Sequence, residues 1–134
     1  MRILVVDDDE TNRLIVRLLM ELRGYGVIEA ESGAEAAQVL AKEEVDAVLM
    51  DIQMPDLDGY DSTVLIRQNP QLQDVPVLAL TSHTSDDIRR RCVDCGMNGF
   101  MRKPFDANLA AEMSTAIERH VKSRPTAAIG WLVG

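Results

Sequence analysis

The chain has 134 residues, of which 46% are hydrophobic, a size at which one domain buries a single core. Its 14 basic residues are outnumbered by 22 acidic residues, and the net charge of -8 repels nucleic-acid phosphates and anionic membrane surfaces. We therefore expect no direct nucleic-acid partner.

The apolar runs of the chain are short. Those over Ile3 to Val6 and Ala47 to Met50 fall far short of the roughly 20 residues needed to cross a bilayer, so no membrane insertion is expected. Cys92 and Cys95 are too few for a disulfide framework, and no charged leader precedes the first apolar run. These features favour a cytoplasmic protein.

The first strand and helix have the clearest pattern. The apolar run over residues 3–6 predicts a strand, and Asp9 is placed to N-cap a helix that Gly24 ends. The residues at core spacing in this helix are Leu14, Ile15, Leu18, Leu19 and Leu22. We expect this set to pack against the rest of the protein.

Two further strands follow this helix. Residues 27–30 predict a weaker strand, after which Ser32 can cap a helix that runs to about Lys42. The residues available for packing in that helix are Ala36, Ala37, Val39 and Leu40. The run over residues 47–50 is apolar throughout, as expected of a central parallel strand covered on both faces. It runs directly into Asp51, whose carboxylate therefore stands at the C-terminal end of a strand.

The second half of the chain repeats the alternation. The predicted elements are a helix over 60–67, a strand over 77–80, a helix from 85 to about 95, a strand over 100–102 and a helix capped by Asp106. Thr81 directly follows the fourth strand, and Lys103 follows the fifth. The alternation of strands and helices predicts an α/β fold, with a parallel sheet covered by helices on both faces.

The last helix sets the boundary of the domain. The residues that can share one of its faces are Leu109, Met113, Ile117 and Val121. Residues 1–122 are therefore predicted to form one domain. The stretch after Ser123 carries a proline, two glycines and the only Trp without a helical period, so residues 123–134 are predicted to be a tail or the start of a linker.

Polar side chains follow four of the predicted strands. In an open parallel α/β sheet, ligands bind at the carboxyl ends of the strands, so Asp7, Asp8, Asp51, Thr81 and Lys103 should meet at one edge. Three carboxylates in one pocket repel one another unless a cation neutralises them, and an all-oxygen site suits Mg²⁺. The sequence therefore predicts a site for Mg²⁺, or for Mn²⁺ in its place.

Such a site suits phosphoryl transfer. Asp51 is the predicted acceptor, whose carboxylate attacks an activated phosphorus while the metal screens charge. Lys103 can pair with Asp51 or with a phosphoryl oxygen, and the Thr81 hydroxyl can donate a hydrogen bond to another oxygen. Phosphorylation adds roughly -1.5 to -2 charges, enough to pull the hydroxyl and its loop toward the acceptor. That movement is the predicted signal.

Four motifs give the chain a resemblance to a known family. They are VVDDD (5–9), LMDIQMPDLDG (49–59), LALTS (78–82) and MRKPF (101–105). In this order and spacing they resemble the response-regulator receiver domain of two-component signalling, over about residues 1–122. The resemblance implies a flavodoxin-like (βα)5 fold with a five-stranded parallel sheet of order 2-1-3-4-5. Receivers of hybrid sensor kinases and stand-alone regulators both carry similar motifs.

The resemblance also implies roles for individual residues. Asp51 corresponds to the phosphoacceptor, and Asp7 and Asp8 correspond to the acidic pair that binds Mg²⁺. The backbone carbonyl of Gln53 is implied as a further ligand of the ion.

Further roles concern the switch. Thr81 and Phe100 correspond to the coupled switch pair of the family, in which the ring turns inward when the hydroxyl residue moves. Gln53 and His83 occupy positions that tune how long the phosphoryl group lasts in receivers.

The partners implied by the resemblance are a histidine kinase or a histidine phosphotransfer domain, with no downstream effector specified. In receivers, the flank of the first helix near the site, here Asn12 and Ile15, and the loop at Phe105 dock the domain that donates the phosphoryl group. Because many receivers dimerise through the fourth helix, fifth strand and fifth helix, a phosphorylation-dependent dimer is an arrangement that the resemblance allows.

Two other classes of protein compete with a signalling switch that slowly hydrolyses its own acyl phosphate. A haloacid-dehalogenase-like phosphatase also uses a strand-end Asp and Mg²⁺, but it needs a second Asp two residues on, where this chain has Gln53. A binding module would be a flavodoxin-like cofactor carrier or a receiver that no longer takes phosphate. The chain lacks a glycine-rich phosphate loop for the first of these and has an intact acceptor set, which argues against the second.

Overall fold

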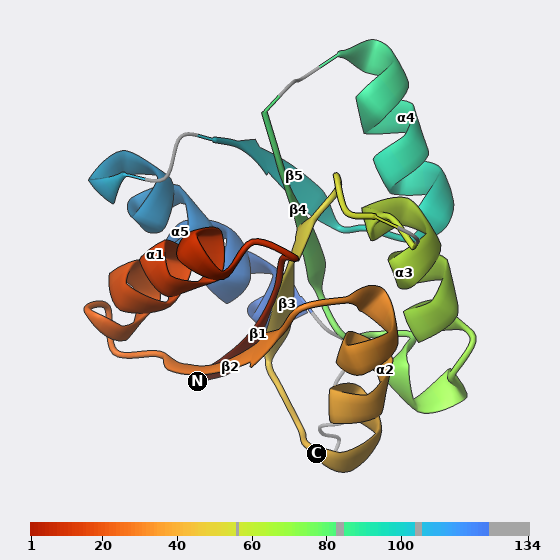
Figure 1. Cartoon of the computed structure of the whole chain (residues 1–134), viewed down its shortest axis with the longest axis horizontal. Coiled ribbons are helices and arrows are strands. Elements are labelled where there is room, and N and C mark those ends of the chain that lie inside the picture. Colours follow the sequence, from red (N-terminus) through yellow and green to blue (C-terminus); the bar gives the residue numbers. More distant parts are fainter. Residues whose placement is uncertain (56, 83–84, 104–105, 124–134) are drawn as a thin grey trace.

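A single parallel sheet forms the centre of the computed structural model, which describes residues 1–55, 57–82, 85–103 and 106–123 (Figure 1). The strand order is β2-β1-β3-β4-β5, as expected for a flavodoxin-like sheet. The strands are β1 (Arg2–Val6), β2 (Gly26–Ala30), β3 (Ala47–Asp51), β4 (Val77–Thr81) and β5 (Gly99–Arg102). The helices are α1 (Glu10–Glu21), α2 (Gly33–Lys42), α3 (Gly59–Arg67), α4 (Asp86–Cys95) and α5 (Ala107–Ser123). A short 3-10 helix, η1 (Pro70–Leu72), was not predicted from the sequence.

Helices cover both faces of the sheet. Helices α1 and α5 lie on one face, and α2, α3 and α4 lie on the other (Figure 1). Each strand contributes side chains to both hydrophobic layers, because successive side chains along a strand point to opposite faces of the sheet. In β3, for example, Leu49 packs in the α1–α5 layer, whereas Val48 and Met50 pack in the other. In the described residues, no helix is both long enough and apolar enough to span a membrane.

The predicted core face of α1 is wrong in part. Three of the residues assigned to it are exposed, namely Leu14 at 51%, Leu18 at 51% and Leu22 at 85%. The buried residues of this helix are Val16 and Met20. Val16 lies about 200° around the helix axis from Leu14, so the two rows of apolar residues cannot both face the sheet. The apolar arc of α1 is simply wider than the surface that the sheet and α5 cover.

The predicted N-terminal caps of the helices agree with the structure, whereas α1 ends at Glu21, three residues before the predicted Gly24. Asp9 caps α1 by accepting hydrogen bonds from the backbone N–H groups of Thr11 and Asn12, and Ser32 and Ser85 cap α2 and α4 in the same way. Asp106 Oδ1 accepts from the N–H of Leu109 at 2.9 Å. The expected face of α5 is also confirmed, with Leu109, Met113 and Ile117 buried and Val121 partly buried.

Candidate functional site

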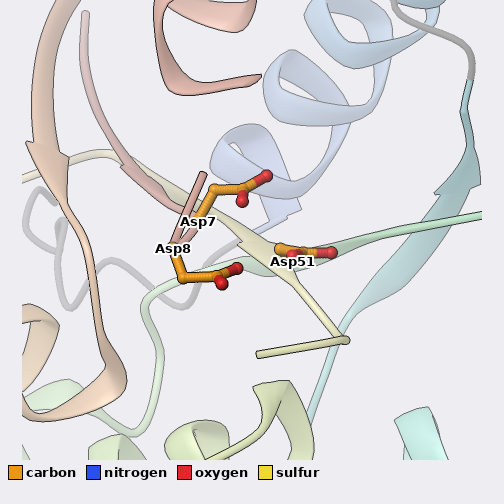
Figure 2. Close-up of side chains that lie close together, drawn as sticks. All are labelled: Asp7, Asp8 and Asp51. Atoms are coloured by element: carbon orange, nitrogen blue, oxygen red, sulfur yellow. The ribbon is translucent and has the colours of Figure 1, made fainter. Parts of the chain in front are cut away.

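Three carboxylates meet at the carboxyl edge of the sheet. Asp51 is the last residue of β3, and Asp7 and Asp8 directly follow β1. Asp7 is 2% exposed and Asp51 4% exposed, whereas Asp8 is open to solvent. One oxygen from each carboxylate lies within 4.8 Å of the others, and Figure 2 shows the groups gathered at the strand ends. The spacing suits three ligands of one cation.

Asp7 is held on one side and open on the other. Its Oδ1 accepts a hydrogen bond from the backbone N–H of Asp9 at 2.9 Å. Its Oδ2 is buried, and no donor among the described residues reaches it. Burial, reinforced by the negative charge of Asp51, raises the pKa of Asp7 to about 6. A buried carboxylate oxygen without a donor is costly by itself, and a cation would satisfy it.

Asp51 has a positive partner. Lys103 Nζ lies 3.2 Å from Asp51 Oδ1, and the same oxygen accepts a longer hydrogen bond of 3.4 Å from the N–H of Gln53. Burial raises the pKa of Asp51, while the charge and hydrogen bond of Lys103 oppose that rise. The Asp51 carboxylate is therefore paired with the ammonium group of Lys103, although it is nearly inaccessible to water.

Gly59 lets α3 approach the end of β3, a role that its place in a turn did not reveal. Its N–H donates to the carbonyl of Ile52 at 2.9 Å. A Cβ atom at this position would lie 2.5 Å from the carbonyl oxygen of Asp51 and 2.7 Å from Cα of Ile52. Only a glycine fits against this backbone. The sequence signal for this close approach is the glycine that directly follows Asp58, the N-cap of α3.

The residues of the predicted switch lie on adjacent strands. Thr81 ends β4 and is 3% exposed, and its carbonyl accepts from the N–H of Lys103 at 2.8 Å. Phe100 on β5 pairs with Ala79, which lies two residues before Thr81, so both side chains belong to the same face of the sheet. The Phe100 ring is partly buried, and the guanidinium of Arg89 lies over it at 5.1 Å from its centroid.

The remaining predicted residues lie around this centre or outside the described residues. Asn12 and Ile15 are partly exposed on α1, in the two turns nearest the acidic cluster. His83 and Phe105 lie outside the described residues. The roles of these four residues in docking and in phosphoryl lifetime stay predictions.

The family of the chain follows from its match to a sequence model. The model of the response regulator receiver domain matches residues 3–115. The chain belongs to this receiver-domain family. Receiver domains of this family occur in sensor kinases and in response regulators of two-component systems, where their partners are histidine kinases or phosphotransfer proteins.

The receiver domain has curated relatives that are much longer than itself. It is 36% identical over 109 residues to the CAI-1 autoinducer sensor kinase/phosphatase CqsS of Vibrio cholerae, an alignment that covers 81% of this chain and 16% of that protein. Across seven relatives that are sensor proteins or histidine kinases, the alignments cover between 6% and 16% of the relative's length. Membership in the receiver family supports a signalling role for the chain.

Solved receiver structures have the same fold. The chemotaxis protein CheY4 of Vibrio cholerae superposes with a TM-score of 0.82 at 28% identity, covering 87% of this chain and 97% of that chain. The receiver domain of sensor histidine kinase PA1611 of Pseudomonas aeruginosa gives 0.81 at 33% identity, covering 91% and 98%. That structure contains a magnesium ion coordinated in its active-site cleft. The acidic cluster of this receiver domain, with its unpartnered Asp7 Oδ2, is compatible with such an ion.

Proposed function

We propose that this receiver domain accepts a phosphoryl group from a phosphohistidine on Asp51 in a Mg²⁺-dependent reaction. The observation that carries the proposal is the placement of Asp51. Its carboxylate is buried at the end of β3, faces the carboxylates of Asp7 and Asp8, and is paired with Lys103 at 3.2 Å. The Asp51 carboxylate is thus shielded from competing water and already oriented by the positive charge of Lys103.

The residues that would hold the ion are Asp7, Asp8, Asp51 and the backbone carbonyl of Gln53. All are hard oxygen donors, which Mg²⁺ prefers and Mn²⁺ accepts. A divalent ion bound there supplies charge stabilisation for the phosphoryl oxygens as they approach the acidic cluster.

The chemistry on the protein side belongs to Asp51. A carboxylate oxygen attacks the phosphorus and forms a new P–O bond, while the P–N bond to the donor histidine breaks and its electron pair stays on the imidazole. The products are an aspartyl phosphate and, when the other ring nitrogen of the phosphohistidine carries a proton, a neutral histidine. During the transfer, Lys103 would shift its charge from the carboxylate to a phosphoryl oxygen and so stabilise the charge that develops there.

The signal would pass from β3 to β4 and then to β5. The Thr81 hydroxyl would donate a hydrogen bond to the phosphoryl group, and the space vacated by Thr81 would admit the ring of Phe100. Both side chains lie on one face of the sheet, which supports this coupling. The altered surface of α4 and β5 would then change partner binding, including formation of a phosphorylation-dependent dimer.

The acyl phosphate would be lost slowly by hydrolysis, so the protein acts as a switch rather than as a turnover enzyme. Gln53, two residues after Asp51, and His83, two residues after Thr81, would set this lifetime. We place the receiver domain at residues 1–122, with residues 123–134 as a tail or linker start. The donor, a histidine kinase or histidine phosphotransfer domain, would dock near Asn12, Ile15 and Phe105 in the cytoplasm.

Intact-mass measurement tests the proposal. Incubation with acetyl phosphate and Mg²⁺ should give one phosphoryl adduct that is lost at alkaline pH, and EDTA should prevent it. Asp51→Asn should abolish the adduct, whereas Asp61→Asn, at an exposed carboxylate on α3, should leave it unchanged. A wild-type protein without an adduct, or an adduct that persists in Asp51→Asn, contradicts the proposal.

A further inference from the structure

Arg13 of α1 reaches back to the turn that carries the acidic pair. Its Nη1 donates a hydrogen bond of 2.7 Å to the backbone carbonyl oxygen of Asp7. Its Nε donates to Glu29 Oε1 on β2 at 3.1 Å. The side chain is only 12% exposed, so the guanidinium is held between the turn and the strand rather than in solvent.

The contact of Arg13 fixes a particular peptide plane. The carbonyl of Asp7 belongs to the peptide bond that joins Asp7 to Asp8, and a peptide unit is planar. A hydrogen bond to this carbonyl therefore restrains rotation of the peptide plane between Asp7 and Asp8. The orientation of this plane determines the directions in which the two acidic side chains leave the backbone. The N–H of Asp7 is held as well, because it donates to the carbonyl of Ala30 at 3.1 Å. The backbone of Asp7 is thus fixed from both sides, while its buried Oδ2 has no hydrogen-bond donor among the described residues.

The charge of Arg13 is balanced locally. Glu29 accepts from Arg13 with Oε1 and from Arg17 Nη1 with Oε2 at 2.8 Å, so one carboxylate bridges two arginines. Arg17 makes its other ion pair with Glu21, on the same helix, at 3.2 Å. Both arginines therefore share the Glu29 ion pair, but only Arg13 also donates to the backbone of the acidic turn.

We propose that Arg13 is a positioning residue for the divalent cation, which orients Asp7 and Asp8 through the carbonyl between them. The inference rests on the proposed function of the acidic cluster as a Mg²⁺ site. Outer hydrogen bonds that orient metal ligands typically contribute about 10- to 100-fold in metal affinity. Here the restrained group is the ligand backbone rather than its carboxylate, so we expect the lower end of this range, roughly 10-fold.

Calorimetric titration of the full chain with MgCl₂ tests the inference. Arg13→Gln should raise the Mg²⁺ dissociation constant about 10-fold. Arg13→Lys should have an intermediate effect, because an ammonium group can donate to the carbonyl but lacks the guanidinium fork. Arg17→Gln is the matched control, since it removes a Glu29 ion pair without touching Asp7, and its dissociation constant should stay near that of wild type.

Saturating Mg²⁺ gives a second readout. If Arg13 positions the ligands, excess Mg²⁺ should restore the rate of phosphorylation of Arg13→Gln by acetyl phosphate, whereas a general loss of structure would not be rescued. Melting in EDTA checks that each variant is folded. Equal Mg²⁺ affinity in Arg13→Gln and Arg17→Gln overturns this inference but not the proposed function. Failure of both Arg13 variants to fold has the same consequence. A wild-type protein that does not bind Mg²⁺ overturns the proposed function itself.

Discussion

Lys103 and Asp51 form an ion pair between β5 and β3 across the width of β4. The Nζ–Oδ1 distance is 3.2 Å, and the two side chains are 17% and 6% exposed. Because β4 separates their strands, the pair is made only at the edge of the sheet, where Lys103 follows the end of β5. The ion pair places the positive charge of Lys103 beside Asp51, which is the member of the acidic cluster that belongs to a strand.

Lys103→Met should remove this charge while keeping most of the side-chain volume. We expect phosphorylation by acetyl phosphate to slow by ~100-fold, because one preorganised charged donor is lost from the site of developing charge. The initial rate of adduct formation measures the effect. Lys42→Met, at an exposed position in the last turn of α2, is the control and should retain the wild-type rate. An unchanged rate in Lys103→Met would show that Lys103 serves only as a structural partner of Asp51.

Asp7 should make the ion-free protein more stable in mild acid than at neutral pH. Its pKa is about 6 in the folded state against 3.8 for the free side chain. The folded protein therefore binds this proton more tightly than the unfolded chain does. The resulting stability is fully present below about pH 4 and is lost as the pH rises through 6. The raised pKa of Asp51 acts in the same direction.

Urea denaturation in EDTA between pH 4.5 and 7.5 measures this dependence, at pH values chosen as roughly bracketing the titration. Asp7→Asn should raise the free energy of unfolding at the upper pH by on the order of 2 kcal/mol and flatten the profile. Mg²⁺ should stabilise wild type most at the upper pH, where the carboxylate is ionised. A wild-type profile that rises with pH in EDTA would refute this account of Asp7.

Gly59→Ala should destabilise the fold although alanine is the better helix former. The added Cβ would lie 2.5 Å from the carbonyl oxygen of Asp51, which belongs to the rigid end of β3. We expect a loss of about 1–3 kcal/mol in the free energy of unfolding, as for overpacked sites in general. Gly26→Ala is the control, because its nearest neighbour is the flexible side chain of Arg2 at 3.4 Å. Equal stabilities of the two variants would contradict the close approach of α3.

Arg67 should stabilise the fold without affecting the site. It ends α3 and donates to the backbone carbonyls of Leu72, Val75 and Gly96 and to the side-chain oxygen of Asn98. Arg67→Met leaves these acceptors without their charged donor, at a cost of about 3 kcal/mol. Mg²⁺ affinity should not change. Arg90→Met on the exposed face of α4 should be neutral in stability, and a neutral Arg67→Met would refute the assignment.

The sequence allowed the fold and the centre of the site to be predicted because both depend on local patterns. Alternating strands and helices determine that strand ends share an edge, and Asp7, Asp51, Thr81 and Lys103 each follow or end a strand. Convergence at that edge needs only the topology, so no knowledge of side-chain conformation was required.

The rest depends on contacts between distant segments. The orientation of α1 was mispredicted because its apolar residues form two rows, and only packing on the sheet decides that Val16 and Met20 are buried while Leu14 is exposed. The carbonyl bonds of Arg13 and Arg67 were missed for a similar reason. An arginine can reach many acceptors, and its partner is chosen by tertiary structure rather than by sequence spacing.

The two-sided packing of β3 has a mechanical consequence. Val48 and Met50 are locked into one hydrophobic layer and Leu49 into the other, so a shift of this strand would have to disturb both layers at once. The strand that carries Asp51 is thus firmly held, as is its neighbour β4, whose Val77 and Ala79 pack in one layer and Leu78 and Leu80 in the other. Any displacement that begins at its carboxylate should be relieved sideways, toward the edge strand β5, whose residues are partly buried or exposed.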